Sequence, residues 1–155
     1  MTRGYFGIGI ENCKSGVNVG TLWRSAHNLG ASFIFTIGNR YRFQGSDTTK
    51  AWRSIPLFQY PTFDAFYGNL PHDCQLVGIE FPHEKAKALP EFMHPDRCVY
   101  LLGAEDPGLF ADDLEAVQNL TNRIVAVRDG MSLATPRTLV QVGQLEIASA
   151  PSLSI

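Results

Sequence analysis

The feature that most constrains this chain is the alternation of short apolar strands with amphipathic helices along most of its length. Hydrophobic periodicity predicts strands at residues 4–10, 32–37, 55–60, 75–81, 97–102 and 123–127, and helices at residues 18–29, 62–69, 85–92, 111–119 and 138–150. Strands that are separated by helices are joined by crossovers and therefore lie parallel. The pattern predicts an α/β fold, with one open parallel sheet and helices on both of its faces.

The ends of two predicted helices carry specific signals. Gly30 follows the helix at residues 18–29 and is predicted to end it. Thr62 is predicted to cap the next helix, because its hydroxyl can accept a free backbone N–H. A chain of 155 residues that is 45% hydrophobic can bury one core, so we expect a single domain over residues 1–155.

Ligands of open parallel sheets bind beyond the carboxyl ends of the strands. The segments of interest are therefore those that follow Ile10, Ile37, Glu80, Leu102 and Val127. A dinucleotide fingerprint is disfavoured, because Gly7 and Gly9 fall inside the first strand, whereas the fingerprint needs its glycines in the turn. The sequence also contains no Walker loop, HExxH motif or GxSxG elbow.

The charge of the chain is uneven along its length. Net charge is only −2, which by itself argues against a nucleic-acid binder. Residues 13–60, however, carry six Lys or Arg and one Asp, whereas residues 61–122 carry three Lys or Arg and eleven Asp or Glu. This asymmetry predicts either one face with a positive field for phosphates or simply two solvated surfaces of opposite sign.

The sequence indicates a cytoplasmic protein with no membrane segment and no metal site. No apolar run approaches the roughly 20 residues that span a bilayer, and the N-terminus has no signal-peptide core. The three cysteines are widely spaced and form no CxxC pair, and the four histidines lack ligand spacing.

Three segments stand out when they are read in order. They are Asn18–Ala26 (NVGTLWRSA), Leu101–Leu109 (LLGAEDPGL) after a strand, and Gly130–Leu133 (GMSL) after the last strand. Together they resemble the motifs of the SpoU/TrmH branch of the SPOUT family of RNA ribose methyltransferases. The resemblance implies a cytoplasmic homodimer that transfers a methyl group from S-adenosylmethionine to a ribose 2′-hydroxyl of tRNA or rRNA. It also implies a sheet whose C-terminal segment forms a trefoil knot, although knots are rare in proteins.

The resemblance implies that Arg24 is the catalytic residue, assisted by Asn18 and Glu105. Because the pKa of arginine exceeds about 12, Arg24 is a poor base and is expected to orient the 2′-hydroxyl and a phosphate. Asn18 either caps the helix or holds Arg24 or the RNA backbone. Glu105 is expected to orient Arg24 or Asn18, with a solvated loop carboxylate as the alternative.

The cofactor residues implied by the resemblance follow three strands. They are Ile79, Gly103, Gly108, Val127, Ser132 and Leu133. The two glycines suit a backbone that approaches the cofactor closely or takes a positive φ. Apolar Ile79 and Val127 fit plain core residues equally well.

The basic segment is expected to supply the RNA contacts, because 155 residues leave no room for a separate RNA-binding domain. Its candidate phosphate ligands are Arg40, Arg42, Lys50 and Arg53.

The third motif departs from the family pattern. The family reads approximately S-L-N-V-A, whereas this chain reads Ser132-Leu133-Ala134-Thr135-Pro136. Residues 134–155 are therefore expected to be atypical. Two alternatives to an active enzyme stay open: an RNA-binding module of the same fold without turnover, and an unrelated α/β nucleotide-binding enzyme.

Overall fold

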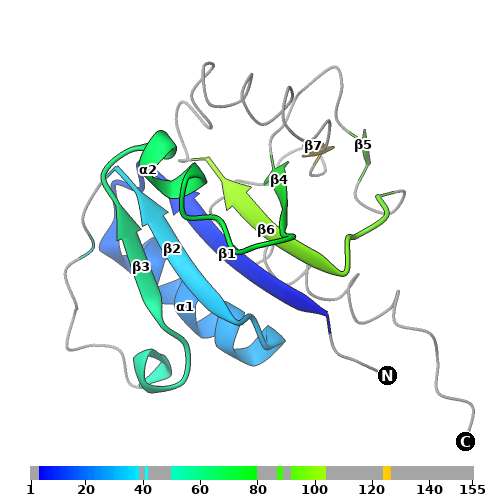
Figure 1. Cartoon of the computed structure of the whole chain (residues 1–155). Coiled ribbons are helices and arrows are strands. Elements are labelled where there is room, and N and C mark those ends of the chain that lie inside the picture. The colour runs from blue at the N-terminus through cyan, green and yellow to red at the C-terminus, as the bar shows by residue number, and fades with distance from the viewer. Residues whose placement is uncertain are drawn as a thin grey trace, which may run out of the picture.

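The computed structural model describes residues 4–38, 41, 50–79, 87–88, 92–103 and 124–126, with 87–88 and 124–126 described by their backbone alone. The elements, in order, are β1 (Tyr5–Glu11), α1 (Gly16–Leu29), β2 (Phe33–Ile37), the 3₁₀ turn η1 (Ala51–Arg53), β3 (Leu57–Tyr60), α2 (Phe63–Tyr67), β4 (Gln75–Ile79), β5 (Lys87–Ala88), β6 (Arg97–Leu102) and β7 (Ile124–Ala126). Figure 1 shows them around one twisted sheet.

The strands form a seven-stranded sheet in the order β3-β2-β1-β6-β4-β7-β5. Every pairing in it is parallel, which confirms the predicted fold class. The chain runs outward from β1 to β3, then crosses to β4 on the other side, and β6 fills the place between β1 and β4 (Figure 1). The strand order therefore reverses beside β1, where ligands of such sheets bind at the carboxyl edge.

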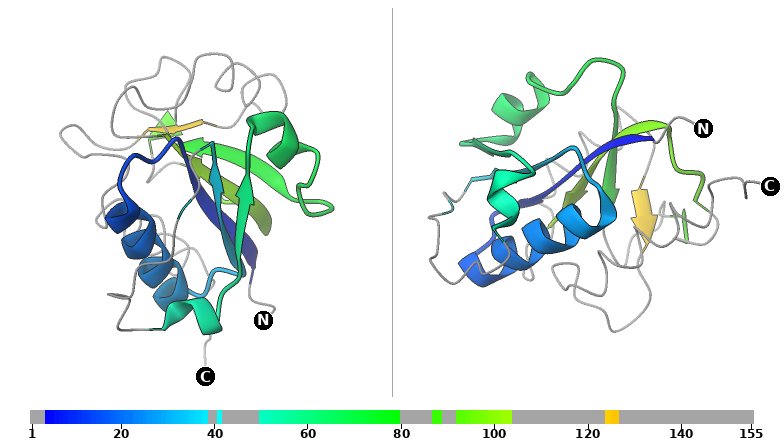
Figure 2. Two further views of the ribbon diagram at one scale, coloured as in Figure 1. Left: turned by 90° about the vertical axis from the view of Figure 1, so that its left-hand side faces the viewer. Right: turned by 90° about the horizontal axis from the view of Figure 1, so that it is seen from below.

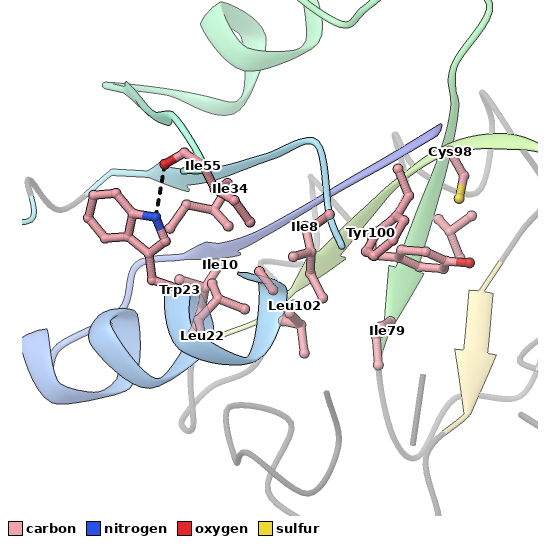
Figure 3. Packing of buried hydrophobic residues seen from close by; sticks show 14 of the residues in the cluster. Ile8, Ile10, Leu22, Trp23, Ile34, Ile55, Ile79, Cys98, Tyr100 and Leu102 are labelled. Carbon is pink, nitrogen blue, oxygen red and sulfur yellow. Dashed lines mark hydrogen bonds between the residues drawn. The ribbon is translucent and has the colours of Figure 1, made fainter. Parts of the chain in front are cut away.

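Helices cover both faces of the sheet. Figure 2 shows α1 and α2 on opposite sides of the strands. Against one face, Leu22 and Trp23 of α1 pack on a buried cluster that includes Ile8 and Ile10 (Figure 3). Against the other face, α2 packs on the aromatic side chains of β2, and the ring of Phe66 stacks on Phe35 with centroids 4.4 Å apart. Alternate residues of each strand therefore enter different cores.

Packing against β2 explains why β1 has glycine at positions 7 and 9. A Cβ on Gly7 would lie 2.2 Å from the ring of Phe33, and one on Gly9 would lie 2.5 Å from both the ring and the carbonyl of Phe35. The neighbouring strand thus fills the space that side chains on these glycines would need. Both lie inside the strand, as predicted, and not in a phosphate-binding turn.

The first helix begins earlier than predicted. It starts at Gly16 with Ser15 as the N-cap, and the backbone N–H of Asn18 donates to the Ser15 carbonyl at 3.1 Å. Of the two alternatives for Asn18, capping of the helix is therefore wrong, because Asn18 is already the third helical residue. Gly30 ends the helix with φ 77°, as predicted.

The predicted cap of α2 is confirmed. The Thr62 hydroxyl accepts from the backbone N–H of Ala65 at 3.2 Å.

The helix predicted at residues 85–92 is wrong where the structure describes it. Lys87 and Ala88 form the short strand β5, which pairs with Val125 and Ala126 of β7, and Phe92 lies outside any helix. Pro90 would interrupt a helix here, whereas strand pairing satisfies backbone groups of Lys87 and Ala88. The helices predicted at 111–119 and 138–150, and the implied knot and atypical segment 134–155, lie outside the described residues.

Candidate cofactor and RNA site

Three of the strand ends singled out by the sequence lie next to one another. Ile79, the last residue of β4, pairs with Leu102 of β6 on one side and with Val125 of β7 on the other. Ile79 is fully buried and Gly103, which follows Leu102, is also buried. The parallel register thus places Ile79, Gly103 and the end of β7 along one carboxyl edge.

A buried carboxylate lies at the same edge. Ile10 of β1 pairs with Leu102, so Glu11 occupies the next position along β1, level with Gly103. Glu11 also pairs with Ile37 of β2 and is only 2% exposed. Sequence reasoning did not single out this residue. The signal was present, because Glu11 directly follows one of the strands whose carboxyl ends were of interest.

The turn that leaves β1 is packed against the turn that leaves β2. Asn12 takes a left-handed backbone with φ 47°, and its N–H donates to the Ile37 carbonyl at 2.8 Å. Gly38 has φ 83°, and a Cβ on it would lie 2.2 Å from the Asn12 Oδ1. Gly38 is therefore required both for its dihedral and for space. The Asn12 carboxamide is held at the carboxyl edge beside Glu11.

The first motif lies on α1, which runs along one face of the sheet. Val19, Leu22, Trp23 and Ala26 are buried, whereas Arg24 is exposed. Within the described residues, the guanidinium of Arg24 makes no hydrogen bond or ion pair. Asn18 is half-buried, and at 100° per residue it lies about 120° around the helix from Arg24. The two side chains leave the helix on different sides.

Gly20 shares the side of α1 that carries Arg24, since the two are one helical turn apart. A Cβ on Gly20 would meet only the Tyr41 hydroxyl among the described residues, at an ordinary 3.8 Å. Glycine inside a helix costs about 1 kcal/mol relative to alanine. The described part of the chain therefore gives no packing reason for this glycine, unlike Gly7 and Gly9.

The turn η1 carries two of the predicted RNA ligands and is fixed to α1. Lys50 and Arg53 are exposed at its two ends. The Trp23 indole N–H donates to the Ile55 carbonyl at 3.0 Å, as Figure 3 shows. This bond is buried, so it ties the segment after η1 to the helix that bears Arg24.

The remaining predicted site residues lie outside the described residues. They are Glu105, Gly108, Val127, Ser132 and Leu133 of the catalytic and cofactor sets, with Arg40 and Arg42 of the RNA set. Among the described residues, no group of His, Cys, Asp or Glu is arranged to hold a metal ion.

Several solved structures have the same fold as this chain. The AdoMet-bound rRNA methyltransferase of Sinorhizobium meliloti superposes with a TM-score of 0.74 at 18% identity over 96% of this chain and 58% of its own. The SpoU methyltransferase AviRb of Streptomyces viridochromogenes gives 0.70 at 19% identity over 95% of this chain and 62% of its own. A structure described as giving insight into 2-OH methylation of C/U34 on tRNA gives 0.69 at 18% identity over 96% and 90%.

These likenesses show the fold, and this chain spans less than two thirds of the first two proteins. No curated protein sequence matches the chain. The model of the SpoU rRNA Methylase family matches residues 6–133. This range includes all three motif segments and the ends of β1, β4, β6 and β7 that form the carboxyl edge. The chain belongs to the SpoU rRNA methylase family.

Proposed function

We propose that this protein transfers a methyl group from S-adenosylmethionine to a ribose 2′-hydroxyl of tRNA or rRNA. The observation that carries the proposal is the family match over residues 6–133, which spans both the helix that presents Arg24 and the aligned ends of β4, β6 and β7. S-adenosylmethionine would supply the electrophilic methyl group. The protein must hold the acceptor oxygen in line with the bond between that methyl group and sulfur.

The described part of the carboxyl edge suits an adenosyl group. Ile79 is buried and apolar, and Gly103 brings a bare backbone beside it. Backbone N–H and C=O groups can read the adenine edge, while the absent side chain lets the ligand approach closely. Gly108, Val127, Ser132 and Leu133 complete the proposed cofactor set. The S. meliloti enzyme of the same fold was solved with AdoMet bound.

Arg24 is the proposed catalytic residue. Its guanidinium donates several hydrogen bonds in one plane, so it can hold the ribose hydroxyl and a neighbouring phosphate together. Arg24 would fix the acceptor oxygen while its new bond to the methyl carbon forms and the bond from that carbon to sulfur breaks, so that the thioether leaves and the hydroxyl proton passes to solvent. We propose that Glu105 fixes the position of the guanidinium and that Asn18, which leaves the helix on another side, holds the RNA backbone.

The outward direction of Arg24 supports a homodimer. Val17, on the same helix, is 66% exposed, and a partner that covers this helix would bury it. In such a dimer, Arg24 of one protomer completes a site with the carboxyl edge of the other. Light scattering after size exclusion tests this proposal, because a mass near that of one chain would contradict it.

Arg40, Arg42, Lys50 and Arg53 are the proposed phosphate ligands. Neutralising all four should flatten the plot of log binding constant against log salt by about 0.7 per lost contact. The measurement is RNA binding by fluorescence anisotropy at several salt concentrations. An unchanged slope would show that these residues are only solvated surface.

The proposed location is the cytoplasm, where tRNA and rRNA are available. In the ranges that the structure describes, neither helix is long and apolar enough to cross a bilayer.

The direct test is transfer of a radiolabelled methyl group from S-adenosylmethionine into a mixed tRNA and rRNA pool. We expect incorporation by the wild type and a loss of at least about 100-fold in Arg24→Ala, the scale on which a positioned catalytic group contributes. His27→Ala, an exposed residue on the same helix, is the matched control and should keep wild-type activity. No incorporation by the wild type contradicts the proposal.

The altered third motif favours a second candidate, an RNA-binding module without turnover. Ala134-Thr135-Pro136 replaces the N-V-A of the family, so a segment that the family resemblance assigns to the cofactor pocket differs in its chemistry. Calorimetry separates the two candidates. RNA binding without S-adenosylmethionine binding supports the module, and micromolar cofactor binding supports the enzyme.

A further inference from the structure

The turn η1 exposes a large aromatic side chain between two cations. Trp52 is 42% exposed, whereas the other tryptophan of the chain, Trp23, is only 6% exposed. The guanidinium carbon of Arg53 lies 5.0 Å from the centroid of the Trp52 ring, and Lys50 is exposed just before it. No Asp or Glu occurs between Asp47 and Asp64, so this part of the chain is uniformly positive.

The backbone under Trp52 is firmly held. Ala51 and Ile55, on either side of the exposed residues, are 1% and 4% exposed in the core beneath α1. Backbone N–H groups of Ser54 and Ile55 both donate to the Ala51 carbonyl, at 2.9 and 3.0 Å. The buried bond from Trp23 to the Ile55 carbonyl fixes the turn to the helix. Trp52 therefore projects from a rigid base and needs little ordering to receive a ligand.

The turn η1 is joined to the helix that bears the proposed catalytic residue. Trp23, which holds Ile55, directly precedes Arg24 on α1. The proposed RNA contacts at η1 and at Arg24 thus belong to one connected part of the fold, α1 and the turn that it holds.

We propose that Trp52 stacks on an unpaired base of the substrate RNA, with Lys50 and Arg53 binding the phosphates beside that base. An exposed indole with flanking cations is the arrangement that binds single-stranded nucleic acid, since each base offers a flat face and each linkage a negative charge. A paired base in an A-form helix offers no free face to the indole. The inference rests on the proposed function and narrows its substrate to RNA that is single-stranded or looped near the modified nucleotide.

The test uses the full-length protein with a labelled single-stranded RNA and the same strand in a duplex. We expect Trp52→Ala to weaken single-strand binding by about 5- to 100-fold, whereas Trp52→Phe retains most of the affinity because phenylalanine still stacks. Trp52→Ala should leave the slope of log binding constant against log salt unchanged. Lys50→Ala and Arg53→Ala should each reduce the magnitude of that slope by about 0.7. Duplex binding should respond little to Trp52→Ala.

Tyr67→Ala is the matched control. Tyr67 is 38% exposed on α2, on the opposite face of the sheet from η1, and its removal should leave RNA affinity unchanged. Intrinsic fluorescence gives a second readout, since the chain has only two tryptophans. Binding of RNA should quench the wild type but not Trp52→Phe, which retains only the buried Trp23.

Three results would overturn the inference. The first is an affinity of Trp52→Ala for single-stranded RNA within about twofold of the wild type. The second is an equal loss of affinity for single strand and duplex in Trp52→Ala. The third is a change in the oligomeric state of Trp52→Ala without a change in its RNA affinity. Methyl transfer measured in parallel separates the two proposals. If the wild type transfers methyl groups and Trp52→Ala binds RNA as well as the wild type does, only the stacking site is overturned. If Trp52→Ala weakens RNA binding but the wild type transfers no methyl group, only the proposed enzyme activity is overturned.

Discussion

For Arg24, the sequence motif identifies the residue, whereas only the structure shows which way its side chain points. The motif Asn18–Ala26 singles out this arginine from its spacing, but the spacing does not say where the guanidinium points. The structure shows that it points outward, because α1 buries Trp23 and Leu22 against the sheet. The side chain is therefore available to RNA or to a second protomer, which is the property that the proposed chemistry needs.

His94 is a described residue whose burial makes stability depend on pH below neutrality. Its Nδ1 lies 2.5 Å from the hydroxyl of buried Tyr100, and burial lowers the pKa of the imidazole below its usual 6.5. The folded state thus binds a proton less readily than the unfolded chain. The contribution of His94 to stability is present above the unfolded pKa and is lost as pH falls from there through the lowered, folded pKa.

We expect the free energy of unfolding to fall between about pH 6.5 and the lowered folded pKa, and His94→Gln to flatten this part of the profile. Urea unfolding at several pH values measures it. His27→Gln, at an exposed histidine of α1, controls for loss of an imidazole as such. A His94→Gln profile parallel to that of the wild type would show that burial of His94 is not the cause.

Among the elements, α1 combines a structural and a functional side. Its inner side packs on the sheet, and its outer side carries Arg24 with Gly20 one turn before it. A Cβ at Gly20 has room in the described part of the chain. We infer that Gly20 lacks a side chain so that RNA or a second protomer can approach the backbone of α1 closely.

Gly20→Ala should therefore raise the free energy of unfolding by about 0.5–1 kcal/mol, through helix propensity, while it lowers methyl transfer. Chemical denaturation and the methyl-transfer assay measure the two effects. Gly9→Ala is the contrasting variant, because its Cβ would collide with the Phe35 backbone and should destabilise the fold. A Gly20→Ala variant that is more stable than the wild type and fully active would contradict this inference, because it would show that no ligand approaches α1 at Gly20.

The elements also show how far a pattern can predict structure. The strand at residues 97–102 matches β6 at both ends, because its five buried residues, 98–102, enter the two cores in alternation. The start of α1 was mispredicted because Asn18 is a favourable cap residue in sequence, whereas the turn after Asn12 lets the helix begin at Gly16. The strand β5 could not be predicted, since its pairing partner β7 is far along the chain and only tertiary contact favours it.

At the scale of the molecule, the sheet order explains the candidate site. Since β6 lies between β1 and β4, the carboxyl edge brings Glu11, Gly103 and Ile79 onto three neighbouring strands. The motifs predicted Gly103 and Ile79 but not Glu11, which lies outside the three motif segments although it directly follows Ile10, one of the predicted strand ends. All three residues lie within the range, residues 6–133, that the model of the SpoU rRNA Methylase family matches.

The most direct test of the account is to identify the methylated product. RNA incubated with the protein and S-adenosylmethionine is digested to nucleosides and analysed by mass spectrometry. The account predicts a nucleoside whose added methyl group is on the ribose, formed by the wild type and by His27→Ala but not by Arg24→Ala. A methyl group on a base, or the same ribose-methylated product from Arg24→Ala, would contradict it.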